Sequence, residues 1–189
     1  MVADLAEQMK QKRKGLIILL SGLPGTGKST VARRIRAAAA LPITIHSSDK
    51  IRKQLFRPPT YTDEENAAVH DETQRRIIRS LRHDEVVIYD ATNLREAYRR
   101  WAFKIGQLTN SYALVVVITA DEELARQRLA ERNAHGRSYS DADYDVYVML
   151  RETAEPVACP HIPLIAQPDG CDIIPVLQQI EQLKSIFSV

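Results

Sequence analysis

Eight residues near the amino terminus have the types and spacing needed to bind phosphate groups. Residues 22–29 read GLPGTGKS and fill the pattern G-x-x-x-x-G-K-[ST] without a gap. The glycines let the backbone bend closely around an anion, toward which several amide groups can point. Lys28 can reach the outer phosphates of a nucleotide, and the Ser29 hydroxyl can ligate a bridging magnesium ion. The predicted nucleotide-binding residues are Gly22, Gly25, Thr26, Gly27, Lys28, Ser29 and Thr30.

Two acids and one arginine further along the chain could act on a bound phosphate. Asp49 and Arg52 are three residues apart at the start of a predicted helix, for which Ser47 or Ser48 is the expected N-cap, so they share one side of it. Asp49 is the candidate to take or orient the proton of an acceptor hydroxyl, and Arg52 would hold the acceptor or the transferring phosphate. Asp90 ends a buried strand and would hold a magnesium-bound water, with Ser29 as the other metal residue, or orient Arg52. An ordinary surface pair of Asp49 and Arg52 remains the alternative.

Arginines in the later part of the chain suggest a segment that closes over the phosphates. Arg128 and Arg132 share a helix face, and a turn that carries Arg137 separates this helix from the next. We expect a lid at about residues 124–153, with Arg128 toward the nucleotide and Arg132 or Arg137 in the catalytic set. A surface arginine cluster without function is the alternative.

A third arginine group lies on the predicted helix over residues 62–82, which begins with the capping box Thr62-x-x-Glu65. Arg75, Arg79 and Arg82 form one stripe that could contact an acidic ligand or RNA phosphates. Acids four residues earlier on the same helix favour an ordinary solvated face instead.

The elements that must position these groups alternate between strands and helices. Apolar or β-prone runs predict strands at residues 16–20, 43–46, 86–90, 112–119 and 162–165. Helical patterns between them predict crossovers, and Asn93 is the favoured N-cap of the helix that follows the third strand. The expected fold is a three-layer α/β P-loop NTPase of the kinase type, with a five-stranded parallel sheet, helices on both faces and a helical lid.

Length and composition limit the organisation of the chain. Its 189 residues predict one domain at 15–189, preceded by a polar extension at 1–14. A net charge of +2 does not indicate a nucleic-acid binder, although a local basic surface stays possible. The chain has no apolar run long enough for a membrane span, so we expect a cytoplasmic protein without a membrane partner. The oligomeric state cannot be read from the sequence.

The combination of motifs resembles a known family. Residues 22–30, the Ser48-Asp49-x-x-Arg52 element, residues 90–93 and the Arg128-x-x-x-Arg132 segment are similar to P-loop kinases of the polynucleotide 5′-hydroxyl kinase group. The same elements resemble zeta-toxin-like proteins, seryl-tRNA kinases and several small-molecule kinases. The resemblance spans about residues 15–155.

This resemblance implies a reaction, its cofactors and its partners. The chain is expected to transfer the γ-phosphate of ATP, with Mg²⁺, to a hydroxyl acceptor, foremost the 5′-hydroxyl end of RNA or DNA. The implied catalytic residues are Lys28, Asp49, Arg52, Asp90 and Arg132 or Arg137. A small-molecule or seryl-tRNA kinase of the same fold is one alternative, and a non-catalytic ATP-binding regulatory module is the other.

Overall fold

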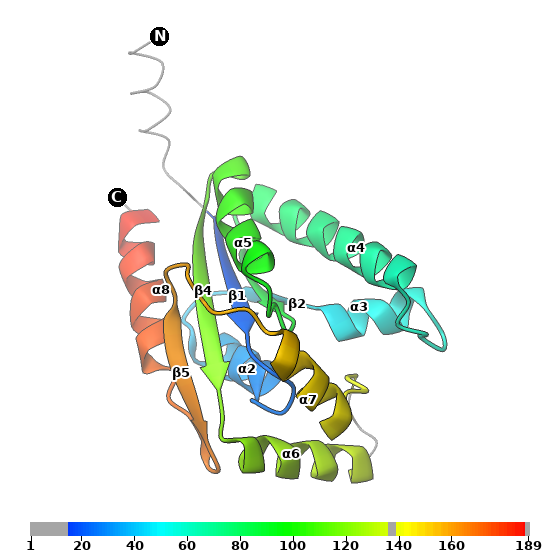
Figure 1. Cartoon of the computed structure of the whole chain (residues 1–189). Helices are drawn as coiled ribbons and strands as arrows, with labels where there is room; N and C mark the ends of the chain where they lie inside the picture. Colours follow the sequence, from blue (N-terminus) through cyan, green and yellow to red (C-terminus); the bar gives the residue numbers. More distant parts are fainter. Residues whose placement is uncertain (1–14, 136–138, 188–189) are drawn as a thin grey trace.

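The protein is described by a computed structural model that covers residues 15–135 and 139–187. The sheet order is β2-β3-β1-β4-β5-β6, and the strands from β2 to β5 run parallel (Figure 1). The strands are β1 (Gly15–Ser21), β2 (Ile43–Ser47), β3 (Val86–Asp90), β4 (Ser111–Thr119), β5 (Ile162–Gln167) and β6 (Gly170–Cys171). The helices are α2 (Lys28–Ala38), α3 (Ser48–Leu55), α4 (Asp63–Arg82), α5 (Glu96–Leu108), α6 (Glu122–His135), α7 (Tyr144–Thr153) and α8 (Ile174–Phe187).

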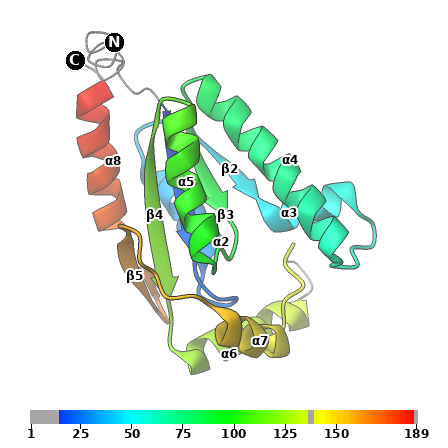
Figure 2. The ribbon, with the colours of Figure 1, turned by 45° about the horizontal axis from the view of Figure 1, so that its top comes forward.

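Strand β1 explains the three layers. Its residues are all buried, because alternate side chains point into two different cores. Leu16, Ile18 and Leu20 pack on one face with α2 and α8. Ile17 and Leu19 pack on the other face with α4 and α5, which both lie on the near side of the sheet in Figure 2. The predicted three-layer P-loop kinase fold is confirmed.

The sheet has one strand more than the sequence predicted. The two-residue strand β6 runs antiparallel to β5, with Ala166 opposite Cys171 and Gln167 opposite Gly170. Gly170 has φ of 145°, a value that glycine adopts more readily than other residues. A strand this short has no apolar periodicity, so pattern analysis could not reveal it.

The topology brings the candidate chemical groups to one edge of the sheet. The carboxyl ends of β1, β2 and β3 lie side by side, with Ser47 of β2 in register with Asp90 of β3. The loop after β1 is tied to the segment after β3 by a hydrogen bond of 3.0 Å from the Gly22 amide to the Thr92 carbonyl. Helices α6 and α7 lie at this same edge, and α6 follows the arrowhead of β4 (Figure 1).

Within the described ranges, no helix has both the length and the apolar character that crossing a membrane requires.

Candidate active site

The phosphate loop has the backbone shape that its glycines predict. Gly25 and Gly27 have φ of 80° and 93°, and Gly27 is the N-cap of α2. A Cβ atom on Gly25 would lie 2.7 Å from the carbonyl oxygen of Ala125 in α6. Thr26 is buried and its hydroxyl donates to the Leu23 carbonyl at 2.9 Å. The loop therefore depends on glycine both for its conformation and for the close approach of α6.

Lys28 lies in the middle of a group of charges. Its Nζ donates to the Leu23 carbonyl at 2.8 Å. Burial lowers the pKa of Lys28 from 10.5 to about 8, while the charges of Asp90 and Asp49 oppose this effect and Arg132 adds to it. Three other residues of the predicted catalytic set are thus close enough for their charges to affect the Lys28 amine. They are Asp49 of α3, Asp90 of β3 and Arg132 of α6.

Ser29 and Asp90, the two predicted metal residues, lie beside each other. Ser29 lies close to the Asp90 carboxylate, which is 7% exposed at the end of β3. Burial raises the pKa of Asp90, although Ser29 and Lys28 act in the opposite direction. An oxygen pair next to a phosphate loop is the donor set that Mg²⁺ prefers. Thr30 follows on the exposed side of α2, where its hydroxyl accepts from Arg33 at 3.1 Å.

Asp49 faces this group from the first turn of α3. That helix begins as predicted, with Ser47 as the N-cap that accepts from the Lys50 amide. The charge of Asp49 acts on five groups from four other elements or loops, which are Lys28, Tyr61, Tyr89, Asp90 and Arg132. Asp49 therefore lies near the phosphate loop, the loop that precedes α4 and the last turns of α6.

Arg52 is held by α4, so the expectation that Asp90 orients it is wrong. Its guanidinium donates to Asn66 Oδ1 at 2.7 Å and pairs with Glu65 at 3.4 Å. The ring of Tyr61 lies 4.6 Å from the guanidinium carbon, at a distance typical of a cation–π contact. The side chain is 11% exposed, so Arg52 has a fixed place beside the site.

Glu65 connects this arginine to the loop before α4. Its carboxylate accepts from the amides of Thr60 and Tyr61 at 2.9 and 2.7 Å and from the Thr60 hydroxyl. Burial alone would raise the pKa of Glu65, but these hydrogen bonds and the charge of Arg52 lower it. One hydrogen bond of the predicted capping box is confirmed, because the Thr62 hydroxyl accepts from the Glu65 amide at 3.3 Å. The Glu65 carboxylate bonds to Thr60 and Tyr61 in place of the Thr62 amide. The role of Glu65 toward Arg52 was missed, since Thr62-x-x-Glu65 is also an ordinary helix start.

The segment after β3 is structural and differs from the prediction. The N-cap of α5 is Arg95 and not Asn93, as the sequence had suggested. The Asn93 side chain donates to the Leu20 carbonyl at 2.7 Å, and its own carbonyl accepts from Ser21 at 3.0 Å. The buried guanidinium of Arg99 donates to the Asn93 and Leu94 carbonyls at 3.2 and 2.8 Å. Asn93 therefore joins the ends of β1 and β3 behind the phosphate loop.

Helix α6 contributes two of the three predicted arginines. Arg128 lies over the phosphate loop, with Nη1 3.4 Å from the Cβ position of Gly27, and donates to the Gln167 carbonyl at 2.6 Å. Arg132 donates to the Ala142 carbonyl. Burial lowers the pKa of Arg132, against the charges of Asp49 and Asp141. Its Nε is the one buried side-chain nitrogen or oxygen without a hydrogen-bond partner in the described part of the chain. Arg137 lies outside the described residues.

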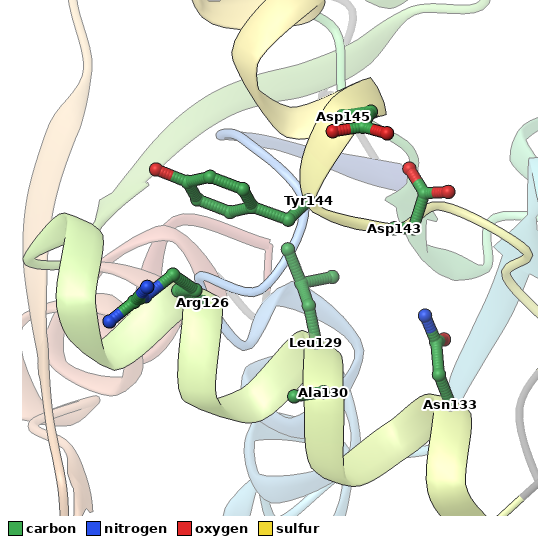
Figure 3. Close-up of a pocket in the computed structure, with 7 residues that line it drawn as sticks. All are labelled: Arg126, Leu129, Ala130, Asn133, Asp143, Tyr144 and Asp145. Atoms are coloured by element: carbon green, nitrogen blue, oxygen red, sulfur yellow. The ribbon is translucent and has the colours of Figure 1, made fainter.

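The pair α6–α7 contacts the phosphate loop through Leu23. This side chain packs against a small cluster built around Ala125, Leu129 and Tyr147. A separate cavity of about 320 Å³ lies between α6 and the beginning of α7 (Figure 3). It is lined by Arg126, Leu129, Ala130, Asn133, Asp143, Tyr144 and Asp145, and none of the predicted site residues is among them.

Comparison with known proteins defines the class as a P-loop kinase fold. The solved structure of the Mycobacterium tuberculosis APS kinase in complex with AMPPNP and APS has a TM-score of 0.62 at 17% identity, covering 91% of this chain and 98% of that one. A gluconokinase from Sinorhizobium meliloti 1021 has a TM-score of 0.55 at 18% identity, covering 94% of each chain. At these identities the similarity establishes the fold.

The sequence comparison then identifies the family. The AAA domain family AAA_33 matches residues 17–157, and the chain belongs to it. An adenylyl-sulfate kinase of Myxococcus xanthus (strain DK1622) is 38% identical over 65 residues, which are 33% of this chain and 33% of that protein. The match thus spans about a third of the length of this curated relative. The resemblance to the polynucleotide kinase group stays a prediction.

Proposed function

We propose that this protein is an ATP-dependent kinase that transfers the γ-phosphate to a hydroxyl group. The observation that carries the proposal is the convergence of Lys28, Asp49, Asp90 and Arg132 on the phosphate loop from four separate elements. A loop alone would serve any nucleotide-binding protein. Two carboxylates and an arginine around it are groups that phosphoryl transfer to an alcohol uses.

ATP with Mg²⁺ is the proposed donor. The loop amides and Lys28 would hold its phosphates, and Ser29 and Asp90 would hold the ion, directly and through water. Among the described residues there is no group of three or more His, Cys, Asp or Glu that could hold a metal alone. This fits an ion that is bound together with substrate phosphates, whose charge it would neutralise.

Asp49 is the proposed general base. The acceptor oxygen would form a bond to the γ-phosphorus as the bond to the oxygen bridging to the β-phosphate breaks, with ADP leaving. The hydroxyl proton would pass to the Asp49 carboxylate. Arg52 and Arg132 would stabilise the charge on the transferring group from opposite sides, since α4 holds one and α6 carries the other.

Helices α6 and α7 would form the lid of a single kinase domain at residues 15–189. Arg128 already lies next to the phosphate loop. Arg132 lies close enough to Asp49 for their charges to interact. The partly unpartnered guanidinium of Arg132 would complete its hydrogen bonds on a phosphate oxygen. Arg137 remains a second candidate for this role.

Two acceptor classes have support. A small molecule is favoured by the adenylyl-sulfate kinase relative. A 5′-hydroxyl end of RNA or DNA is favoured by the exposed stripe on α4, where Arg75, Arg79 and Arg82 line a cavity of about 470 Å³ with Ile78 and His83. Against this, Arg75 already pairs with Glu72 at 3.0 Å, which weakens it as a phosphate contact.

The test uses Asp49→Asn, with Asp71→Asn on the exposed side of α4 as the matched control. Labelled ATP is incubated with adenylyl sulfate, 5′-hydroxyl oligonucleotides, tRNA and simple polyols. We expect transfer to at least one acceptor, a loss of about 10²- to 10⁴-fold in Asp49→Asn, and unchanged ATP binding in both variants. Full activity in Asp49→Asn would remove Asp49 from the mechanism. ATP binding without transfer to any acceptor would favour the regulatory module.

A further inference from the structure

A cluster of aromatic side chains lies near the candidate site and has no role in the reaction as described so far. His70 of α4 contacts Tyr98 and Trp101 of α5, with ring centroids 5.7 and 6.2 Å apart. Trp101 in turn makes an edge contact of 6.1 Å with Tyr89, the residue before Asp90. These four residues are called the ring cluster below.

The ring cluster lies at the carboxyl edge of the sheet. His70 is in the second turn of α4, and Tyr98 and Trp101 are in the first two turns of α5. Both helices begin at this edge, toward which they diverge (Figure 2). Burial, together with Tyr98, Asp49 and Asp90, raises the pKa of Tyr89. Within the ring cluster, Tyr89 is the member next to the site, because Asp90 follows it in β3.

Exposure separates the ring cluster from ordinary helix packing. Farther along the same two helices the contact surface is aliphatic and closed, with Ile77, Leu81, Ala102 and Ile105 at most 4% exposed. At the end beside Asp49 the Tyr98 side chain is 40% exposed and the His70 side chain 35%. Ring surface is thus left open in the halves of α4 and α5 that lie nearer the carboxyl edge of the sheet.

The polar groups around the ring cluster could bind the edge of a heterocycle. The Gln74 amide nitrogen lies 3.0 and 3.1 Å from the two ring nitrogens of His70, so one of its N–H groups points at that ring. The amide also carries a second N–H donor and an oxygen acceptor. Asn66, one turn before His70 on α4, holds Arg52. A molecule stacked on these rings would therefore extend toward Arg52 and Asp49.

We propose that the ring cluster is the acceptor subsite, and that the acceptor carries a nucleobase on the sugar whose hydroxyl is phosphorylated. This inference rests on the proposed function, because it assigns the acceptor of the same site. Adenylyl sulfate and a 5′-hydroxyl polynucleotide end share this chemistry, whereas a polyol such as gluconate lacks it.

The single tryptophan of the chain, Trp101, reports binding without any reaction. Its fluorescence is titrated with adenylyl sulfate, a 5′-hydroxyl dinucleotide and gluconate, after Mg²⁺ and AMPPNP have filled the donor site. We expect saturable quenching by one or both base-containing probes and none by gluconate. The base-containing probe that binds more tightly identifies the source of the acceptor.

Variants on α5 separate stacking from folding. Tyr98→Ala should weaken probe binding and raise the acceptor KM by about 5- to 150-fold, with kcat retained. Tyr98→Phe keeps the ring and should restore most of the probe binding that Tyr98→Ala loses. Leu108→Ala removes an exposed side chain at the far end of α5, outside the subsite, and should match the wild type. Quenching without transfer would leave the subsite standing and refute the kinase.

Three results would overturn the subsite. They are the absence of quenching by both base-containing probes, equal quenching by gluconate, and equal KM values for Tyr98→Ala and Leu108→Ala.

Discussion

The depressed pKa of Lys28 predicts how nucleotide affinity depends on pH. In the free protein, burial brings this pKa to about 8 from an ordinary 10.5, a difference equivalent to about 3 kcal/mol against the charged amine. The phosphates of ATP would supply the negative charge that Lys28 lacks, and its pKa should return to 10.5 or above in the complex. Binding therefore takes up a proton wherever free Lys28 has lost one.

The magnitude follows from this one titration. Between pH 7 and pH 9 the affinity for ATP with saturating Mg²⁺ should fall about tenfold, and the slope should approach one decade per pH unit. Proton uptake on binding should rise from about 0.1 at pH 7 to about 0.5 at pH 8 and about 0.9 at pH 9. Isothermal titration calorimetry in two buffers of different ionisation enthalpy measures both quantities.

Lys28→Arg is the matched control, because a guanidinium stays protonated over this range. Ionisation of the nucleotide affects both proteins equally, so the difference between their slopes of ATP affinity against pH is due to the titration of Lys28. A dissociation constant for the wild type that is constant from pH 7 to pH 9, or the same slope in Lys28→Arg, would refute the reasoning.

Three further predictions concern the framework of the site. Arg99→Leu removes a 1% exposed side chain whose five donors all bond to protein oxygens, so thermal or denaturant unfolding should show a loss of about 3–5 kcal/mol. Arg100→Leu, on the same helix but 63% exposed, should cost less than about 1 kcal/mol, and equal losses would contradict the assignment. Gly25→Ala places a Cβ 2.7 Å from the Ala125 carbonyl at a φ of 80°, so both the melting temperature and ATP affinity should fall; an unchanged affinity would argue against this loop shape. Glu65 has a lowered pKa, so its stabilisation is present above its ordinary value of 4.5 and is lost as the pH falls through the lower folded value. Glu65→Gln should therefore lose less stability than the wild type between about pH 5 and pH 3 in chemical denaturation, and identical pH profiles would exclude this linkage.

Local sequence patterns predicted most of the fold. Strand β1 follows from five consecutive apolar residues that bury both faces, and β3 and β4 follow from similar runs. The beginnings of α3 and α4 follow from Ser47 and Thr62, whose side chains cap the helices as expected. These features depend on residues close together in the chain, so the sequence contains the signal for them.

Contacts between distant residues were beyond such patterns. Arg52 could be placed on a helix, but its partners Glu65 and Asn66 are 13 and 14 residues away on another helix. Arg99 looked like any helical arginine, although it bonds to the carbonyls of Glu155 and Pro156. The ring cluster went unnoticed because its members come from three elements. Their meeting depends on how α4 and α5 cross the sheet.

Leu23 belongs to the phosphate loop and also contacts the proposed lid. The Leu23 side chain packs into the small core of α6 and α7, while its carbonyl accepts from both Lys28 and Thr26. If Lys28 turns to a phosphate, Leu23 keeps the Thr26 hydroxyl as a donor, so the carbonyl is not left without a partner. Loss of the hydrogen bond from Lys28 to the Leu23 carbonyl therefore costs little free energy at that carbonyl. The loop can keep its contact with α6 and α7 as the triphosphate binds.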